Sequence, residues 1–518
     1  MSLRVIAISA PEYPFGRLGT TSLTSRDPVS LYNASRYAAF LADNQLGAWG
    51  DSNWAVPRKI RRKNLLLMNS LSEETSYFEE LLARERPNLL LIGAMTMCFP
   101  GAIACAKLAR QMFGESIYIV LGGRHASETI YTDKARTCVK HHNGSPLKLI
   151  SEGKIDNVFD LIVSGEGEFV IAKVGEVIAD LAGRNDSWIT PALMLENISN
   201  IPGNWIAGCV TDGHMKTIIS KGITFDRDRL PSPAKMFGIG TGFDVFQGAL
   251  TGHAFSDMGT GCIYDCGFCS ERTSVCGPLS QVKTSSNRLF RQLMDIHDVI
   301  KEDTPGRRTS AFIEDSIILG GLTSQLTKLN SILEDHSIDI KFGGQLTVDT
   351  AIKQKLIITE LVPKGLEYIF VGLETFDPSS IGGMSKDVGK YEWIMRAEQM
   401  ISEYSEIGIK VGVSILFGLG ESQQQRLAIL EQVSSWKQRY GNPVVRSFNW
   451  AVQHPLKGKD NGVGYDYLNW AVEKVEYVDV LRDYGEASLI YHIPNVTLPT
   501  VEELLEIRAI MKADEVTD

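Results

Sequence analysis

The first third of the chain alternates short apolar runs with stretches of helical pattern. The apolar runs are residues 4–9, 64–69, 88–94, 116–121 and 161–164. Helical patterns lie between several of them, for example over residues 73–85 and 102–113. Nearly continuous apolar strands that alternate with helices are typical of a parallel sheet covered on both faces. The pattern therefore predicts an α/β domain over residues 1–200, with ligands at the carboxyl ends of its strands.

The alternation weakens between residues 186 and 250. This stretch contains Pro191, Pro202, Pro231 and Pro233, and glycines become frequent from Gly238 onward. Prolines and glycines interrupt regular elements. We expect little regular structure here and a connecting segment over residues 201–250.

A second alternating region follows, and it defines a domain over residues 251–456. The predicted strands are residues 254–260, 309–313, 341–346, 368–373, 410–417 and 444–450. The predicted helices include residues 286–301, 325–334 and 391–405. Six strand–helix units are too few for a closed eight-stranded barrel, which usually takes ~250 residues. An open, partial barrel is the expected architecture.

The last segment, residues 457–518, is aromatic-rich and acidic. Helical patterns over residues 465–483 and 501–514 predict a small, mostly helical region. We expect this region to close the open barrel and shape its pocket, with Trp470, Tyr477 and Tyr491 as candidates. An aromatic stripe at helical spacing is also typical of ordinary core packing.

Composition and charge narrow the function classes. The 518 residues are 44% hydrophobic and 22% charged, which is globular composition. No apolar run reaches the ~18 residues of a membrane span. The N-terminus resembles a first strand rather than a signal peptide. A net charge of -10 argues against broad capture of nucleic acid. We expect a cytoplasmic protein.

The eight cysteines are unevenly placed: Cys262, Cys266, Cys269 and Cys276 fall within fifteen positions. The loop reads Gly259-Thr-Gly-Cys-Ile-Tyr-Asp-Cys-Gly-Phe-Cys269, and its C-x3-C-x2-C spacing brings three thiolates together. A structural zinc site wants four ligands, and Cys276 would have to be the fourth. A [4Fe–4S] cluster held by three cysteines instead leaves one iron open to a small molecule, with Cys276 as a bystander.

This cysteine spacing, with an aromatic residue before the last cysteine, resembles the radical S-adenosylmethionine (SAM) superfamily. The resemblance covers residues 254–456 and implies a partial (β/α)6 barrel with Cys262, Cys266 and Cys269 as cluster ligands. In that superfamily the open iron binds the amino and carboxylate groups of SAM. Reduction of SAM then gives methionine and a 5′-deoxyadenosyl radical, which abstracts hydrogen from unactivated carbon.

Four further residues stand where the superfamily binds SAM. The segment from Ser414 to Glu421 resembles the fifth-strand G-x-I-x-G-x-x-E motif, with serine for the first glycine. The superfamily's second-strand G-G-E motif is absent, and Glu314 with its neighbours occupies its place. The resemblance implies that four residues of these segments bind SAM, although each residue taken alone would also fit an ordinary turn or helix cap. These positions are Glu314, Glu374, Ser414 and His454.

Glycine-rich strand ends in the first domain resemble the cobalamin-binding subfamily of these enzymes. Glycines at strand ends allow the backbone to approach a large flat macrocycle. A flavodoxin-like or nucleotide-binding module is the alternative for this half. The implied cobalamin-binding residues are Thr96, Gly122, Gly123, His125, Gly165, Glu166, Gly167 and Glu168.

The chain contains no D-x-H-x-x-G motif, so that motif supplies no histidine ligand to cobalt. The resemblance therefore implies base-off cobalamin without a histidine ligand. His125 is expected to contact the nucleotide side of the cofactor or to cap a helix, and Cys98 is a weaker candidate on the cobalt side.

The resemblance implies a methyltransferase that moves a SAM-derived methyl group, via methylcobalamin, to an unactivated carbon. Its implied partners are a small-molecule substrate and an external electron donor of the flavodoxin or ferredoxin type. Two alternatives stay open at this point. One is a non-methylating enzyme of the same architecture that performs a cyclisation, ring contraction or rearrangement. The other is a non-catalytic protein that binds cobalamin and zinc.

Overall fold

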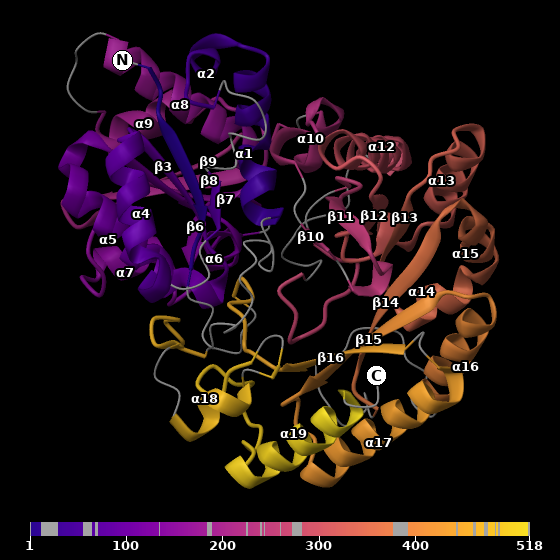
Figure 1. The fold of residues 1–518 in the computed structure, drawn as a ribbon. Coiled ribbons are helices and arrows are strands. Elements are labelled where there is room, and N and C mark those ends of the chain that lie inside the picture. The colour runs from indigo at the N-terminus through magenta and orange to yellow at the C-terminus, as the bar shows by residue number, and fades with distance from the viewer. Residues whose placement is uncertain are drawn as a thin grey trace. The chain divides into compact units, whose positions relative to one another are not determined.

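The computed structural model describes residues 2–11, 29–54, 65–67, 71–133, 135–183, 189–223, 226–238, 241–242, 244–258, 261–271, 282–376, 392–441, 444–458, 463–470, 475–481, 483–484 and 487–515. The chain divides into two compact units (Figure 1). The first unit comprises Met1–Gly238 and Pro455–Ala471, and the second comprises Ile239–His454 and Val472–Asp518.

The first unit is built on a seven-stranded sheet of order β2-β1-β3-β4-β7-β8-β9. The strands from β2 to β7 pair in parallel, whereas β8 and β9 continue the sheet antiparallel. Their bounds are β1 Val5–Ser9, β2 Leu65–Leu67, β3 Leu89–Gly93, β4 Tyr118–Gly122, β7 Leu161–Gly165, β8 Trp205–Thr211 and β9 His214–Ile219. A separate short hairpin joins β5 (Ile130–Thr132) to β6 (Val139–His141).

Helices cover both faces of this sheet. Alternate strand positions, such as Val5 and Ala7, pack against α1 (Val29–Asp43), α2 (Gly47–Gly50), α8 (Glu168–Gly183) and α9 (Pro191–Ile198). The intervening positions, such as Ile6 and Ile8, pack against α4 (Leu71–Glu85), α5 (Phe99–Phe113) and α7 (Pro146–Ser151). Because successive strand residues point to opposite faces, an unbroken apolar run buries side chains in the hydrophobic cores on both faces of the sheet.

The second unit contains a curled sheet of order β10-β11-β12-β13-β14-β15-β16. The pairs from β11 to β16 are parallel, and only the two-residue β10 (Thr241–Gly242) is antiparallel. The parallel strands are β11 Ala249–Ala254, β12 Arg308–Ile313, β13 Lys341–Leu346, β14 Leu366–Glu374, β15 Lys410–Phe417 and β16 Val444–Trp450. β11 and β16 are the two end strands of the parallel series. In the described sheet they do not pair with each other, so the barrel is open.

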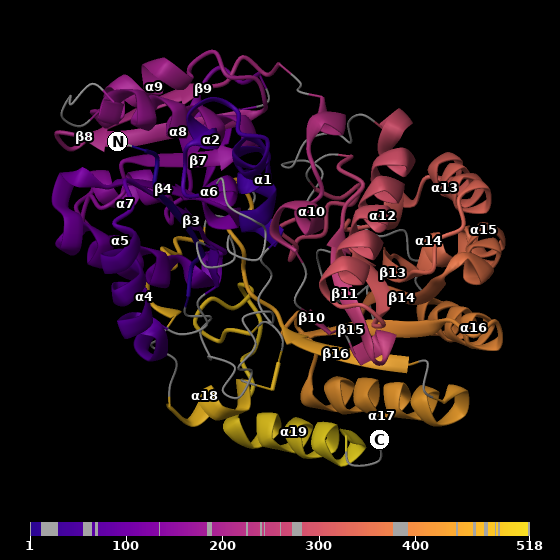
Figure 2. The ribbon, with the colours of Figure 1, turned by 45° about the horizontal axis from the view of Figure 1, so that its top comes forward.

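The connecting helices lie on the outer, convex side of this curled sheet (Figure 2). They are α12 Ser285–Asp303, α13 Thr323–Asp335, α14 Val348–Lys353, α15 Lys355–Leu361, α16 Trp393–Glu406 and α17 Gln423–Tyr440. The predicted fold class, a Rossmann-like parallel sheet followed by a partial (β/α)6 barrel, is confirmed. Of the C-terminal region, α18 (Val475–Leu481) and α19 (Val501–Glu515) are helical.

Two expectations about regular structure were wrong. The stretch predicted to have little regular structure contains β8, β9 and α10 (Pro233–Phe237). Asp212 and Gly213 both adopt positive φ and form the tight hairpin turn between β8 and β9. The first barrel strand was predicted over residues 254–260, but it spans Ala249–Ala254 and shares only Ala254 with that range; Asp257, beyond it, takes φ 51°.

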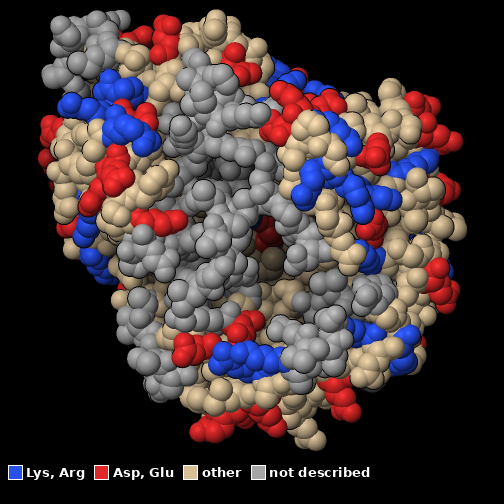
Figure 3. All heavy atoms as spheres, in the orientation of Figure 1, with Lys and Arg blue, Asp and Glu red and all other residues tan. Residues whose placement is uncertain are grey.

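The described surface carries charges of both signs. On the face drawn in Figure 3, acidic and basic side chains occur in small groups and neither sign forms one continuous field. Among the described helices, none has the length and apolar character that crossing a bilayer requires.

Candidate functional site

Polar side chains gather on the concave face of the barrel sheet. Thr251 Oγ and Ser310 Oγ lie 2.8 Å apart across β11 and β12, which fixes the shared face of these two strands. Side chains two and four residues further along point the same way. On β15 and β16 the face is marked by Asn449, whose Nδ2 donates to Ser414 Oγ at 3.3 Å. Near the carboxyl ends this face therefore presents His253, Glu314, Ser414 and Asn449.

The other end of the same face is closed by aromatic packing. Phe246, Phe312 and Tyr368 form one buried cluster with Ala249 and Val245, and Phe370 packs against it. A Cβ added at Gly412 would lie 2.0 Å from Tyr368 Oη, so only glycine fits there. The floor is therefore filled by side chains, and the polar positions lie toward the carboxyl ends of the strands, where barrels of this kind hold their sites.

The cysteine loop follows β11 at that carboxyl end. Cys262 N–H donates to Glu271 O at 2.7 Å and closes the loop on itself. Two backbone amides point at sulfur: Tyr264 N–H lies 3.5 Å from Cys262 Sγ and Glu271 N–H lies 3.4 Å from Cys269 Sγ. None of the seven cysteines that the structure describes takes part in a disulfide.

This loop fits an iron–sulfur cluster. Amide donors to sulfur stabilise thiolate charge and tune the potential of a cluster that the thiolates hold. Within the described ranges, no three His, Cys, Asp or Glu side chains converge on one point that a metal ion would occupy. Three cysteines that ligate a [4Fe–4S] cluster bind three separate irons, so their sulfurs need not converge. Cys276 lies outside the described residues.

The segment between β11 and the cysteine loop is anchored by buried polar groups. Phe255 N–H donates to Gln292 Oε1 at 2.9 Å, and Arg288 Nε donates to Ser256 O at 2.9 Å. Asp315, after β12, accepts Ser256 N–H at 3.0 Å. Burial, reinforced by nearby Asp257, raises the pKa of Asp315 to about 6. These contacts fix where the chain enters the cysteine loop.

Glu314 is paired within this unit. Its Oε1 lies 2.5 Å from His253 Nδ1, and both side chains are largely shielded from solvent. Its backbone N–H donates to Ala254 O at 2.9 Å. The pair therefore joins the ends of β11 and β12 on the concave face. His253 was not among the predicted residues, because the first barrel strand was predicted to begin at Ala254 and the strand in fact spans Ala249–Ala254.

Glu374 ends β14 in an unusual backbone conformation. Its φ is 63°, and the pairing of β14 with β15 shifts register between Gly372 and Glu374. A non-glycine residue at positive φ costs free energy, and such residues cluster at functional sites. A β-bulge of this kind re-aims a side chain at the end of a strand. The observation supports Glu374 as a candidate site residue.

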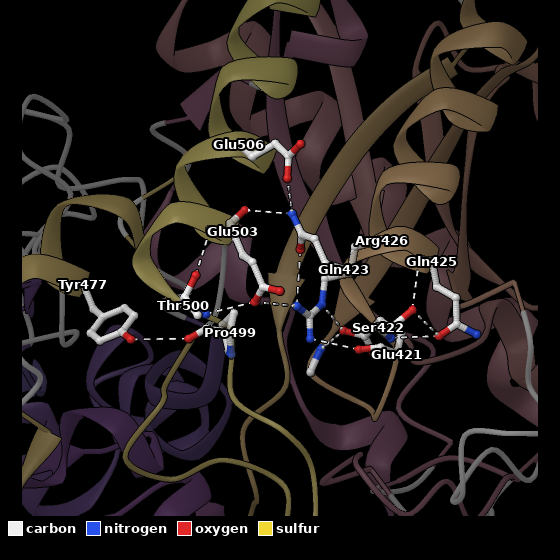
Figure 4. A network of polar contacts seen from close by, with 11 residues as sticks. Glu421, Ser422, Gln423, Gln425, Arg426, Tyr477, Pro499, Thr500, Glu503 and Glu506 are labelled. Carbon is white, nitrogen blue, oxygen red and sulfur yellow. Dashed lines mark hydrogen bonds and ion pairs between the residues drawn. The ribbon is translucent and has the colours of Figure 1, made fainter.

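The loop after β15 is organised around Glu421 (Figure 4). The carboxylate of Glu421 accepts Gly418 N–H at 2.6 Å, Leu419 N–H at 2.9 Å and Arg426 Nε at 2.9 Å. The Arg426 guanidinium also lies 5.0 Å from the centre of the Trp450 ring. Glu421 and Arg426 are both almost completely buried. The acid of the fifth-strand motif is thus an internal brace of the loop.

The remaining predicted residues of the barrel lie after β16. His454 is partly buried, and its carbonyl accepts Gln453 Nε2 at 3.0 Å. Tyr477 Oη donates to Pro499 O at 3.3 Å, and Tyr491 is buried. Trp470 belongs to the first unit rather than to the barrel.

In the first unit, glycines at the strand ends meet different constraints. A Cβ at Gly123 would lie 2.5 Å from Ala94 N, and one at Gly165 would lie 2.4 Å from Asn204 O, so neighbouring backbone demands glycine at both. At Gly122 and Gly167 the nearest protein atom would be 3.8 Å away. Packing among the described residues does not require glycine at either position, which fits a surface that a ligand approaches closely. We call this surface, formed by Gly122, Gly123, Gly165 and Gly167 at the ends of β4 and β7, the crest.

His125 is completely buried beside this crest. Its ring stacks on Phe99 with centroids 4.1 Å apart. Its Nε2 lies 2.9 Å from Gly144 O, and because a carbonyl only accepts, Nε2 carries the proton. Thr96 Oγ is 3.3 Å from Nδ1 and donates to Glu128 Oε2 at 2.9 Å. The single hydroxyl hydrogen of Thr96 goes to Glu128, so the hydrogen bond from Nε2 to Gly144 O and the stacking on Phe99 are the contacts that hold the ring.

We predict that His125 makes the first unit acid-sensitive. Burial lowers the pKa of His125 to about 3, whereas the unfolded chain takes up its proton near pH 6.5. Stability is therefore lost as the pH falls below about 6.5, by about 2 kcal/mol at pH 5. Urea unfolding of the wild type and of His125→Gln at pH 7.5 and pH 5.0 measures this. The carboxylates contribute alike to both proteins. An equal loss of unfolding free energy between pH 7.5 and pH 5.0 in the wild type and in His125→Gln would therefore contradict the prediction.

The two acids after β7 are held differently. Glu166 accepts Asn204 N–H at 2.7 Å and pairs with Arg227. Glu168 begins α8 and is buried, which raises the pKa of its carboxyl, while Arg36 and Arg227 act in the opposite direction. Glu166 thus connects the end of β7 to the segment before α10, and Glu168 is buried at the start of α8.

Comparison with solved structures gives the fold a context. One match is the cobalamin-dependent S-adenosylmethionine radical enzyme OxsB with aqua-cobalamin and S-adenosylmethionine bound, at 13% identity and TM-score 0.53 over 99% of this chain. The chain has the fold of the cobalamin-dependent radical SAM enzymes. A second match is the radical S-adenosylmethionine methyltransferase TsrM from Kitasatospora setae, with cobalamin and a [4Fe–4S] cluster bound. Its identity is 13% and its TM-score 0.50, over 88% of this chain and 74% of TsrM.

The resemblance predicted from the motifs is thereby confirmed at the level of the fold. This chain spans 61% of the length of OxsB. The sequence itself matches no protein-family model and no curated protein.

Proposed function

We propose that this chain is a cobalamin-dependent radical SAM enzyme that transfers a methyl group from SAM to an unactivated carbon of a small molecule. One observation carries the proposal: a C-x3-C-x2-C loop with amide-to-sulfur contacts stands at the carboxyl end of the first strand of an open six-stranded parallel barrel. The fold shared with OxsB and TsrM supports it.

In this proposal the barrel residues bind the cluster and SAM. Cys262, Cys266 and Cys269 supply the three thiolates. The concave face and the bulge at Glu374 supply the polar contacts for SAM, together with Glu314, Ser414 and His454. A [4Fe–4S] cluster held by these thiolates would supply the electron for reductive cleavage of SAM, which an external donor of the flavodoxin or ferredoxin type would provide. The buried aromatic cluster of Phe246, Phe312 and Tyr368 would exclude water from the opposite end of the barrel.

The crest of the first unit is the proposed cobalamin site. Gly122 and Gly167 leave room above the strand ends, and Thr96, His125, Gly123 and Gly165 shape the backbone beneath. His125 is completely buried, its Nε2 is bonded to Gly144 O and its ring stacks on Phe99, so we assign it a structural role below the cofactor rather than cobalt ligation. Glu166 and Glu168 support the end of β7.

Anaerobic purification and reconstitution test the proposal, followed by analysis of iron, sulfide, cobalt and zinc. We expect about four irons, four sulfides and one cobalt per chain. Incubation with SAM, reductant and a substrate library should then release S-adenosylhomocysteine and 5′-deoxyadenosine in equal amounts. Deoxyadenosine without S-adenosylhomocysteine would indicate a cyclisation or rearrangement instead. Zinc without iron would refute radical chemistry.

A matched pair of glycine variants tests the cobalamin site. Gly122→Ala places its methyl group 3.8 Å from Val163 O, an ordinary contact distance, so we expect unchanged stability and about ten-fold weaker cobalamin binding. In Gly123→Ala the new methyl group would lie 2.5 Å from Ala94 N, and alanine would have to adopt the φ of 90° that Gly123 has. We therefore expect a loss of about 3 kcal/mol in stability. Cobalamin titration followed by absorbance, beside urea unfolding, distinguishes the two. Full cobalamin affinity in Gly122→Ala would place the ligand elsewhere.

A further inference from the structure

The C-terminal segment contributes to the same apolar cluster as the cysteine loop. Leu419 and Ala451 are buried in this cluster, and Phe268, Leu416 and Ile493 pack against it. Phe268 stands between Cys266 and Cys269, whereas Ile493 comes from the segment before α19. A residue near the C-terminus therefore packs in the cluster that supports the cysteine loop and the end of β15.

The same segment is also hydrogen-bonded to the end of the barrel sheet. Gln453, three residues beyond β16, donates its backbone N–H to Tyr491 O at 2.7 Å. Tyr491 N–H in turn donates to Ser488 Oγ at 2.9 Å. These contacts hold residues 488–493 beside the last strand, which is the unpaired end of the parallel series.

A second connection runs from α19 to the loop after β15 (Figure 4). Glu503 Oε2 lies 3.8 Å from Arg426 Nη1, and Arg426 holds the carboxylate of Glu421. Gln423 Nε2 donates to Glu503 O at 3.1 Å and to Glu506 Oε2 at 2.8 Å. The first turn of α19 is thus tied to the first turn of α17, directly beyond Gly418–Glu421.

We propose that the C-terminal segment is a working part of the SAM site, in which Glu503 and Ile493 act as positioning residues. Glu503 sets the loop after β15 through Arg426, and Ile493 packs against Leu419 and Ala451, the buried pair on which Phe268 of the cysteine loop also packs. This inference rests on the proposed function, because it assigns these residues to SAM held at the cluster. Packing alone would stabilise the unit without affecting how tightly SAM binds.

The test is SAM affinity of the reconstituted, cluster-loaded full chain. Glu503 also accepts Thr500 N–H in a helix-capping arrangement, and glutamine serves equally at that position, so Glu503→Gln removes only the charge that faces Arg426. We expect about three-fold weaker SAM binding for Glu503→Gln and about five-fold for Ile493→Ala. The electron paramagnetic resonance signal of the reduced cluster should respond to SAM at correspondingly higher concentrations, with unchanged iron content.

Glu502→Gln and Leu498→Ala are the matched controls, because both side chains are exposed and belong to the same segment. Both should bind SAM as the wild type does. Equal SAM affinity in all four variants, measured well below their melting temperatures, would overturn the positioning role even if Ile493→Ala melts earlier. A wild-type chain that holds a cluster but shows no response to SAM would instead refute the proposed function.

Discussion

Replacing Cys262, Cys266 or Cys269 singly with alanine is expected to abolish cluster binding and all cleavage of SAM. Two remaining thiolates cannot hold a [4Fe–4S] cluster that the loop supplies with three, and the proposed chemistry begins at that cluster. We expect the loss of activity to exceed 1,000-fold, which leaves only background. Iron and sulfide content after reconstitution, and deoxyadenosine formed per chain, measure the effect.

Cys138→Ala is the control for this series. Cys138 is an exposed cysteine of the first unit, so the same thiol-to-methyl change should leave iron content and activity intact. The fold should survive Cys262→Ala and Cys269→Ala as well, with an unfolding free energy within about 1 kcal/mol of the wild type, because both side chains are only partly buried. A Cys262→Ala chain that still carries a full cluster would contradict the ligand assignment.

The architecture of the barrel follows closely from the sequence. The predicted bounds of the strands 341–346, 410–417 and 444–450 coincide with β13, β15 and β16. These strands alternate residues for the helix-covered face with residues for the concave face, and breakers flank them. Where the pattern fails, tertiary pairing decides. β9 is polar and half exposed, and it exists because it pairs with β8 at the edge of the sheet.

The site is less predictable than the fold, for reasons that concern particular residues. The cysteine spacing is local, so the loop could be found without coordinates. His253 and Asn449 contact Glu314 and Ser414 because their strands are neighbours in the sheet. The order of strands cannot be derived from local sequence spacing, so these contacts could not be predicted. Glu421 carries the opposite lesson. Its position in the motif indicates a loop at the SAM site, but its carboxylate is hydrogen-bonded to two backbone amides and to Arg426, so it holds the loop together.

Replacing Arg426 with methionine is expected to destabilise the barrel unit by about 3–5 kcal/mol. Methionine fills much of the space, but it leaves the Glu421 carboxylate buried without a counter-charge, and an unpaired buried charge is costly. The cation–π contact with Trp450 and the connection to Glu503 disappear at the same time. Hydrogen exchange of peptides that cover residues 410–440 reports the loss locally, without assuming that both units unfold together.

Two further variants decide whether the buried charge is the cause. In the double variant Glu421→Gln/Arg426→Met the uncompensated carboxylate is gone while the amide oxygen still accepts a backbone N–H, so about half of the lost stability should return. Arg439→Met removes an arginine from the far end of the same helix, where its pair with Glu398 is exposed, and should cost no more than about 1 kcal/mol. If Arg426→Met lowers the stability of the barrel unit as little as Arg439→Met does, the loop after β15 is held by its apolar neighbours. The connection from α19 to Glu421 then does not stabilise it.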